Sequence, residues 1–459
     1  MASPRTILKK FIPRSLFQKI EPTGHMIEAI IANVRYGFPS RDMHVIGVTG
    51  TNGKTTTSFM IHNMLHKAGY KVGLLTTVAY GVGDDIMPQV AHMTTVSAPE
   101  LQKRLAEFKS QGVEWVVLET TSHALAQHRV WGVPYEIAVL TNITHEHLDY
   151  HGTFERYLVA KRYLFELAAK HGMRFGVVNA DDEHAGDFIA AIPNSIAYGI
   201  KTGELTANNI ELSPEGSHYE ARIGSETYAI HCRIPGEFNV YNSLAAVAVG
   251  RKVGLSREQI EQGIESLEGV EGRMTVIDEG QPFNVVIDYA HTPDSFEKLF
   301  KTLRPLVKGK MIAVFGSAGR RDEEKRAVQG QLAGKYADEI VLTEEDDRDI
   351  DGQEILEHIA AGAEKEGKVK DHNLFLIHDR SEAIRFALSR AERGDTVLLL
   401  GKGHEKDILR NGPKAAELRH LQQDDTNPER VVAIPWDEAG EARRALHELY
   451  LSSDKTLTK

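Results

Sequence analysis

Residues 45–57 constrain the fold of this chain more than any other stretch, because they join a short apolar run to a glycine turn and then to a helix. The run Val45–Val48 is typical of a buried parallel strand. Helical periodicity follows from Thr56 to Tyr70, with one apolar face formed by Phe59, Ile61, Met64 and Leu65. A strand, a glycine turn and a helix in this order predict an α/β fold with a parallel sheet.

The glycine turn itself is suited to phosphate; it consists of Gly50, Thr51, Asn52, Gly53, Lys54, Thr55 and Thr56. Backbone N–H groups at the start of the helix would face an anion, and Lys54 would reach the outer phosphates of a nucleotide. The hydroxyl of Thr55 suits Mg²⁺. Val48 stands where a strict P-loop has its first glycine, but Gly-Lys-Thr after a strand still predicts a nucleotide-binding loop.

Length and composition narrow the class of protein. A chain of 459 residues is too long for one typical core, so two or three domains are expected. The net charge of −11 argues against general nucleic-acid binding. The single cysteine, Cys232, excludes an internal disulfide framework and a thiolate zinc cluster within one chain. With no long apolar run and no signal-peptide pattern, we expect a cytoplasmic protein.

Residues 1–42 form a short basic segment that differs from the rest of the chain. Its first acid, Glu21, is preceded by five cations, Arg5, Lys9, Lys10, Arg14 and Lys19, with apolar residues between them. Pro13 interrupts the pattern, so we expect two short amphipathic pieces rather than one helix. Two interpretations stay open: a helical lead-in packed on the next domain, and a weak membrane-surface contact through residues 1–20.

From Met43 onward, strand-like and helical runs alternate in two series. The first predicts a central ATP-binding domain over residues 43–272, with strands at 45–48, 72–76, 115–118, 137–140, 175–178 and 195–198. Alternating residues within 204–233 predict an antiparallel insertion. The second series predicts a Rossmann-like domain over 273–450, with strands at 284–287, 311–315, 339–342, 374–377 and 396–400. A polar tail, 451–459, follows.

Residues able to bind metal follow two strands of the first series. Glu119 follows the strand at 115–118, and the strand at 137–140 is followed by Asn142, His145, Glu146, His147 and Asp149. Parallel sheets bind ligands at the carboxyl ends of their strands, so these side chains and Lys161 on the next helix would lie near the phosphate loop. His and Glu there would hold Mg²⁺. The histidines alone would equally suit a helix cap.

Several long motifs resemble those of the Mur ligases, which form amide bonds in peptidoglycan precursors. They are Thr49–Thr56, Glu119–Arg129, Asn142–Gly152, Tyr289–Asp294 and Gly401–Glu405, and they occur in the order of that family between about residues 43 and 450. The stretches Ser122–Arg129 and Gly401–Glu405 resemble the branch that adds the third residue of the stem peptide. Folylpolyglutamate synthetases share the ATP loop but lack these two stretches.

The resemblance implies roles for the nucleotide and metal residues. Residues 50–56 would bind ATP together with Asn239, Arg273, Asp288 and His291. Lys54, Glu119, His147 and Lys161 would be catalytic. The metal ligands would be Thr55, Glu119, His147 and Lys161, the last carbamylated, because a carbamate turns a repelling cation into an anionic metal partner.

The resemblance also implies two substrate sites. The acceptor would contact Thr94, Thr95, Thr121, Ser122, Gln127 and Arg129. The amino acid would contact Arg321, Glu345, Asp346, Asp347, Arg348, Gly401 and Glu405. Arg348 suits the distal carboxylate of diaminopimelate, whereas the three acids before it suit the ammonium of lysine. We favour diaminopimelate, with lysine as the alternative, and a third interpretation treats the acidic run as a solvated loop.

Two departures from the family pattern affect this expectation. Family members usually carry an additional N-terminal domain that grips uridine diphosphate, whereas here only a short segment precedes the ATP strand, so we expect weak dependence on the uridine end of the acceptor. The diaminopimelate-adding type has Asp-Asn-Pro-Arg where this chain has Glu345-Asp346-Asp347-Arg348.

The resemblance therefore predicts a monomeric, Mg²⁺- and ATP-dependent ligase that adds meso-diaminopimelate or L-lysine to a muramoyl-dipeptide through an acyl phosphate. Its partners would be small molecules and not nucleic acid. Two alternatives stay open. One is an amide ligase for another acceptor, such as folate, a different polymer precursor or a lipid-linked muropeptide. The other is a nucleotide-binding scaffold without turnover.

Overall fold

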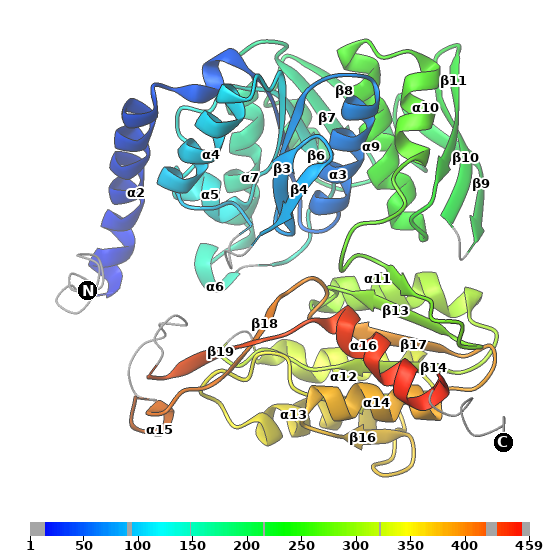
Figure 1. Cartoon of the computed structure of the whole chain (residues 1–459). Helices are drawn as coiled ribbons and strands as arrows, with labels where there is room; N and C mark the ends of the chain where they lie inside the picture. Colours follow the sequence, from blue (N-terminus) through cyan, green and yellow to red (C-terminus); the bar gives the residue numbers. More distant parts are fainter. Residues whose placement is uncertain are drawn as a thin grey trace. The chain divides into compact units, whose positions relative to one another are not determined.

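The computed structural model describes residues 14–89, 94–146, 148–213, 216–320, 323–418 and 429–451. The chain divides into two compact units; the first contains most of the chain as far as Glu268, and the second contains the chain from Gly269 onward together with two short earlier segments, 213–215 and 234–236 (Figure 1). Each unit is built on its own β-sheet with helices on both faces. The predicted α/β fold class with two sheets in series is confirmed.

The sheet of the first unit has eleven strands among the described residues, in the order β11-β10-β9-β8-β7-β6-β1-β5-β2-β3-β4. Strands β2, β5, β1, β6, β7, β8 and β9 are parallel to one another, and antiparallel hairpins lie at both edges. The strands are β1 (His44–Thr49), β2 (Val72–Leu75), β3 (Ala79–Val82), β4 (Asp85–Pro88), β5 (Trp115–Glu119), β6 (Tyr135–Leu140), β7 (Phe175–Asn179), β8 (Asn194–Gly199), β9 (Leu205–Ser213), β10 (Gly216–Ile223) and β11 (Glu226–Cys232).

Helices cover both faces of this sheet, which is why its central strands are apolar in continuous runs. One face carries α3 (Lys54–Lys67), α9 (Glu237–Val253) and α10 (Arg257–Glu265). Apolar residues of the other face share a core with α4 (Ala98–Ser110), α5 (Ser122–Ala126), α7 (Phe154–Ala168) and α8 (Ala185–Ile189). The shorter elements are η1 (Pro39–Asp42) and α6 (Leu148–His151).

Helix α2 (Arg14–Tyr36) leads into the first unit and packs against α4. Its residues His25, Ala29, Ala32 and Asn33 are buried, and the Asn33 side chain donates a 2.7 Å hydrogen bond to the carbonyl of Trp131. The predicted packing of a helical lead-in is therefore confirmed, although α2 is one helix of 23 residues rather than a short piece. The segment before Pro13 lies outside the described residues.

The second unit is a six-stranded sheet in the order β12-β13-β17-β14-β15-β16, counted over the residues that the structure describes. All neighbours are parallel except β12 and β13. A separate hairpin joins β18 to β19. The strands are β12 (Thr275–Ile277), β13 (Asn284–Asp288), β14 (Met311–Phe315), β15 (Glu339–Leu342), β16 (Leu374–Leu376), β17 (Thr396–Leu400), β18 (Asp407–Asn411) and β19 (Val431–Pro435).

Helices of the second unit also lie in two layers. Helices α14 (Arg380–Arg390) and α16 (Glu438–Leu446) pack together, and their apolar residues share a core with those of the sheet (Figure 1). Helix α12 (Glu324–Tyr336) packs between α11 (Pro293–Leu303) and α13 (Gly352–Lys365). The shorter elements are η2 (Arg304–Leu306), α15 (Ala415–Leu418) and η3 (His447–Leu451).

The predicted strands all occur, and so does the predicted helix after the glycine turn, with ends within a few residues of those expected. The stretch 204–233 does form antiparallel strands, but β9 also pairs with β8 in parallel over two residues, so the ribbon extends the main sheet rather than forming a separate insertion. The hairpins β3–β4 and β18–β19 were not predicted, because short edge strands carry little period-two signal.

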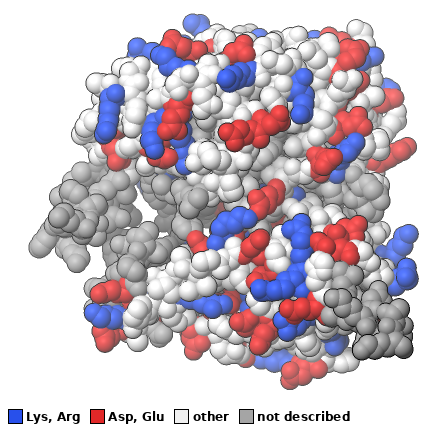
Figure 2. Space-filling view, in the orientation of Figure 1, with Lys and Arg blue, Asp and Glu red and all other residues white. Residues whose placement is uncertain are grey.

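Two general surface observations follow. Within the described part of the chain, no helix combines the length and the apolar character needed to cross a membrane. On the face shown in Figure 2, cationic and anionic side chains alternate over both units, without a broad area of one sign.

A buried ion pair joins several elements of the second unit. Arg380 and Glu438 have fully buried side chains, and the guanidinium donates to both carboxylate oxygens at 2.6 and 2.9 Å. Arg380 also donates to the carbonyls of Leu400, at 2.8 Å, and of Glu344, at 3.0 Å. It therefore ties α14 and α16 to the ends of β15 and β17.

Replacement of Glu438 by alanine should destabilise the second unit by about 3–5 kcal/mol, because it leaves the Arg380 cation buried without its partner. Urea unfolding followed by tryptophan fluorescence measures the change. The matched control is Glu297→Ala, which removes an exposed partner of Lys301 and should shift the midpoint far less. Equal shifts for the two variants would contradict the role given to the buried pair.

Candidate active site

The carboxyl ends of three adjacent strands bring the first group of candidate residues together. Strand β1 lies between β5 and β6, so the turn that follows Thr49 has Glu119 on one side and the segment after Leu140 on the other. This is the edge at which open α/β sheets bind ligands. The glycine turn was predicted to be here, and the structure places Glu119 and Lys161 beside it.

The phosphate loop has the backbone geometry of an anion site. Gly50 and Gly53 have positive φ angles of 150° and 83°, and Gly53 caps the N-terminus of α3. Within the described residues, the N–H groups of Gly53, Lys54, Thr55 and Thr56 have no hydrogen-bond acceptor, as expected for the first turn of a helix. Four open donors and the positive helix end make this turn suited to phosphate.

Asn142, which follows β6, holds the loop in this shape. Its side chain accepts from the N–H of Asn52 and donates to the carbonyl of the same residue, both at 3.0 Å. Its own carbonyl accepts from the N–H of Thr51 at 2.8 Å. The sequence placed Asn142 among metal-site candidates, but in the structure it clamps the loop.

The side chain of Lys54 folds back over the phosphate loop. Its ammonium donates to the carbonyl of Thr51 at 2.8 Å. This contact keeps the cation next to the open N–H groups of the first turn, where an arriving phosphate would offer a stronger, charged acceptor.

Glu119 and Thr55 form a set of oxygen ligands that suits Mg²⁺. The Glu119 side chain is buried, and the hydroxyl of Thr55 donates to its Oε2 at 3.0 Å. Thr77, after β2, donates to the same carboxylate through its hydroxyl and its N–H, each at 3.0 Å. A carboxylate and a hydroxyl beside a phosphate loop are the ligands that Mg²⁺ prefers. Thr77 was not predicted, although its place after a central strand was a usable signal.

Lys161 is buried on α7 and reaches the same loop. Its amine donates to the carbonyl of Gly50 at 2.6 Å and lies 4.7 Å from the centre of the Tyr157 ring. Burial lowers the pKa of Lys161 well below its usual value, and the nearby Lys54 lowers it further, whereas Glu146 and Glu119 act in the opposite direction. A lower pKa increases the uncharged fraction of this amine at a given pH.

The remaining candidates of the first unit lie in different places. His147 lies outside the described residues. His145 stacks on the Phe154 ring at 4.5 Å between centroids. Asn239 lies on α9, where it accepts from Asn242 at 2.8 Å, and Asn242 accepts in turn from Thr57 of α3 at 3.2 Å. Asn239 is therefore linked to the helix of the phosphate loop.

The predicted acceptor residues gather next to Glu119. The hydroxyl of Thr95 donates to the Glu119 carbonyl at 3.0 Å and accepts from the N–H of Thr121 at 3.0 Å. Arg129 donates to the Thr95 carbonyl. Ser122 is buried and hydrogen-bonds the ring of His151 at 3.0 Å. Thr94 and Gln127 are half-buried and have no side-chain bond in this network among the described residues.

The nucleotide residues expected in the second unit form a group of their own at the end of β13. Asp288 accepts from the N–H groups of Met274 and Ala290, both at 2.8 Å, and burial raises its pKa. The guanidinium of Arg273 lies 4.5 Å from the centre of the Tyr289 ring, and the ring of His291 lies 2.8 Å from the Tyr289 carbonyl.

The acidic run after β15 is not a solvated loop, so that interpretation is wrong. Glu345, Asp346, Asp347 and Arg348 are all buried. Cations from distant parts of the sequence offset the acids. Lys402, fully buried, donates to Asp346 at 2.9 Å and to Glu405 at 2.6 Å. Asp347 pairs with His378 at 2.5 Å, and this contact raises the pKa of the imidazole.

Arg348 keeps a fixed turn despite the missing proline. Its backbone is left-handed, with φ 55°, and its N–H donates to the Leu409 carbonyl at 2.9 Å. Its guanidinium donates to the Gly319 carbonyl at 2.7 Å and lies 3.8 Å from Asp346. Gly401 and Glu405 lie beside this group, and Arg321 lies outside the described residues.

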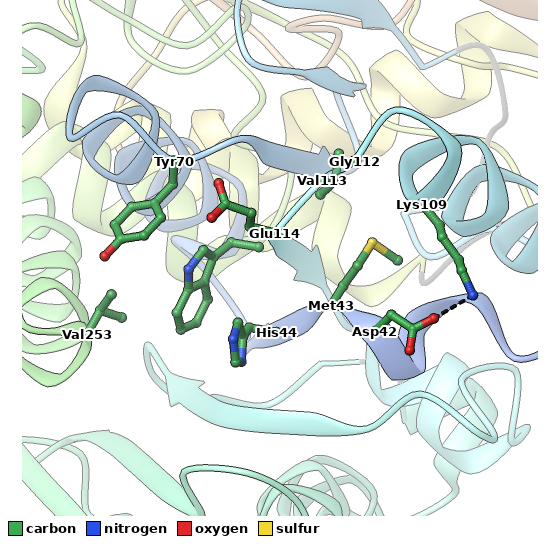
Figure 3. A pocket seen from close by; sticks show the side chains of 10 residues that line it. Asp42, Met43, His44, Tyr70, Lys109, Gly112, Val113, Glu114 and Val253 are labelled. Atoms are coloured by element: carbon green, nitrogen blue, oxygen red, sulfur yellow. Dashed lines mark ion pairs between the residues drawn. The ribbon is translucent and has the colours of Figure 1, made fainter.

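A cavity of about 530 Å³ lies at the opposite edge of the first sheet, at the amino ends of β1 and β5 (Figure 3). Its lining includes His44 and Trp115, whose rings stack at 4.6 Å, and an ion pair of 2.5 Å between Lys109 and Asp42. None of the candidate residues lines it, so it is separate from the phosphate loop.

Comparison with known proteins gives the following matches. Residues 48–250 match the Mur ligase middle domain, and residues 272–403 match the Mur ligase, glutamate ligase domain. The chain is 41% identical to the UDP-N-acetylmuramyl-tripeptide synthetase of Roseiflexus sp. (strain RS-1), over 93% of this chain and 83% of that protein. It is 42% identical to the UDP-N-acetylmuramoyl-L-alanyl-D-glutamate--2,6-diaminopimelate ligase of Geobacillus thermodenitrificans, over 84% and 79%.

A solved structure titled UDP-N-acetylmuramoyl-L-alanyl-D-glutamate--2,6-diaminopimelate ligase has a TM-score of 0.62 and 30% identity to this chain. The match covers 94% of this chain and 83% of that one.

Replacement of Gly50 by alanine should weaken ATP binding at least about tenfold, because the loop could not keep its shape. A Cβ at this position would lie 1.8 Å from the Thr141 hydroxyl, at a φ of 150°. Calorimetric titration with ATP measures the effect. The matched control is Gly69→Ala, which has a similarly left-handed φ of 100° but no atom within 4 Å of the new Cβ. Unchanged ATP affinity in a folded Gly50→Ala variant would contradict the loop geometry.

Proposed function

The chain belongs to the Mur ligases, which are ATP-dependent amide ligases, and we propose that it adds meso-diaminopimelate or L-lysine to a muramoyl-dipeptide precursor of peptidoglycan. The observation that carries this proposal is the carboxyl edge of β1, β5 and β6, where an open phosphate loop, Glu119 and Lys161 lie together. The predicted domain limits, 43–272 and 273–450, are part of the proposal.

The reaction has two steps. A carboxylate oxygen of the acceptor attacks the γ-phosphorus of ATP, and the bond from that phosphorus to the bridging oxygen breaks, which releases ADP and leaves an acyl phosphate. The amine of the incoming amino acid then attacks the acyl carbon, phosphate leaves, and the amine loses a proton. Such a transfer depends on alignment of the reactants and on stabilisation of the charge on the phosphoryl oxygens.

The residues of the first unit supply that stabilisation. The N–H groups of the first turn of α3 and the ammonium of Lys54 would bind the phosphates. Thr95, Thr121 and Arg129 would position the acceptor beside Glu119. Thr55 and Glu119, with His147, would hold Mg²⁺, which when bound offsets the negative charge of the transferring group.

We propose that Lys161 carries a carbamate. An uncharged amine is the form that reacts with dissolved carbon dioxide: the nitrogen bonds the carbon, and one proton leaves. The lowered pKa of Lys161 increases the fraction of the side chain in that form. A carbamate keeps one N–H, so the contact with the Gly50 carbonyl can remain while the new carboxylate adds a negative charge near Thr55 and Glu119.

Location and assembly complete the proposal. We propose a cytoplasmic monomer whose one cysteine, Cys232, is buried and reduced. Contact of residues 1–20 with a membrane surface stays a prediction.

Purified protein should release ADP from ATP only when UDP-muramoyl-dipeptide and a suitable amino acid are both present. The physical reason is that the acyl phosphate forms on the acceptor carboxylate and is consumed by the amine. Coupled-enzyme detection of ADP measures this, with folyl-glutamate as the control acceptor. ADP release with folyl-glutamate as the acceptor, but not with UDP-muramoyl-dipeptide, would indicate a different amide ligase. Absence of ADP release with either acceptor would indicate a scaffold.

Replacement of Lys161 by alanine should reduce turnover at least about a hundredfold, since it removes the carbamate charge beside the metal ligands. Short carboxylic acids should restore part of the activity. Carbon-13 NMR with labelled bicarbonate should show a carbamate signal in the wild type that the variant lacks. The control Lys170→Ala changes an exposed lysine just beyond the same helix. Full activity of Lys161→Ala would disprove the assignment.

A further inference from the structure

Helix α2 has apolar side chains on two opposite sides. Its inner side is buried in the first unit through His25, Ala29, Ala32 and Asn33. On the opposite side, Ile27, Ile31 and Val34 are 52%, 61% and 64% exposed. Figure 1 shows α2 at the margin of the first unit, with α4 on its inner side. The described residues therefore leave the second apolar side of this helix uncovered.

The three exposed side chains form one stripe, which we call the outer stripe of α2. At about 3.6 residues per turn, steps of four and three residues keep them within about 60° around the helix axis. The other exposed large apolar side chains of the described chain lie one to an element, which is ordinary for a protein surface. Three on one helical stripe indicate a surface that a partner covers.

The positions beside the outer stripe are basic. By helical register, Lys19 and Arg35 lie about 80° to either side of Ile27, whereas the two acids of α2, Glu21 and Glu28, lie about 100° or more from it. Arg35 is exposed and has no carboxylate partner within the described residues. Five cations precede the first acid of the chain, although its net charge is −11. Positive charge is therefore concentrated at this end of the chain.

This combination of charge and apolar surface fits an anionic lipid surface. A bilayer interface accepts apolar side chains from one side of a helix, while cations beside them meet the anionic headgroups. Charges more than about 8 Å away are largely screened at physiological ionic strength, so the local cations outweigh the acidic remainder of the chain. A second copy of the chain would bring the same five cations to the stripe again, which disfavours self-association.

We propose that the outer stripe of α2 docks on an anionic lipid surface, with Arg35 and the basic stretch before Glu21 supplying the positive charge. The helix lies parallel to the surface, and Ile27, Ile31 and Val34 enter the boundary between headgroups and acyl chains. Binding is reversible, because three side chains bury far less apolar area than a spanning helix does. This inference concerns where the protein is held and does not depend on the proposed reaction.

Co-sedimentation of the full chain with vesicles tests the proposal. The wild type should bind vesicles of phosphatidylglycerol and phosphatidylcholine at least about tenfold more tightly than pure phosphatidylcholine, and high salt should weaken this binding. The triple variant Ile27→Ser/Ile31→Ser/Val34→Ser should lose about tenfold or more in affinity. The matched control is Val276→Ser/Val328→Ser/Val369→Ser, three exposed valines of the second unit, which should bind as the wild type does. Equal binding by the two triple variants, or no binding by the wild type, would overturn the proposal.

A second measurement reports the stripe directly and stands if the triple variant fails to fold. Tryptophan introduced as Ile31→Trp should shift its emission to the blue on phosphatidylglycerol vesicles and be quenched by brominated lipid, because the ring enters the apolar boundary. Unchanged emission on addition of vesicles would overturn the proposal. Light scattering identifies the other occupant: a wild-type dimer that the triple variant converts to monomer would assign the stripe to a second copy and overturn the lipid contact. Neither measurement uses ATP or an acceptor, so failure here would leave the proposed ligase function standing.

Discussion

The first unit depends on one constraint: the first turn of α3 must present its N–H groups to an anion without support from that anion. A glycine turn alone would have many shapes, because Gly50 and Gly53 restrict the backbone little. Three hydrogen bonds to Asn142 and one from the Thr141 hydroxyl to the Asn52 carbonyl, at 2.6 Å, select one of them. The segment that follows β6, the neighbour of β1, therefore holds the loop in one shape. The loop loses its conformational entropy when the protein folds and not when a nucleotide binds.

Much of this site could be predicted from the sequence, because its signals are local. The loop has its glycines, lysine and threonine in one stretch, and Glu119 directly follows an apolar run whose parallel pairing places it at the same edge. The clamp by Asn142 could not be predicted, since it depends on which strands are neighbours. Strand order is a tertiary property with no signature in a single run.

In the second unit, by contrast, burial of a charged segment could not be predicted from the sequence. Four consecutive charged residues, Glu345 to Arg348, would normally indicate solvent. They are buried because Lys402 and His378, more than thirty residues distant in each case, supply partners. Only the fold brings these cations to the loop. Charge patterns thus predict exposure well on helix faces and poorly at the carboxyl edge of a sheet, where several crossover connections converge.

The hydrogen bonds of Arg380 have a further consequence. The same guanidinium donates to the carbonyls of Glu344 and Leu400, the residues immediately before Glu345 and Gly401. It therefore fixes the spacing between the ends of β15 and β17. An outward movement of either strand end would separate a fully buried ion pair. The carboxyl edge of this sheet is therefore held as firmly as the core of the unit itself.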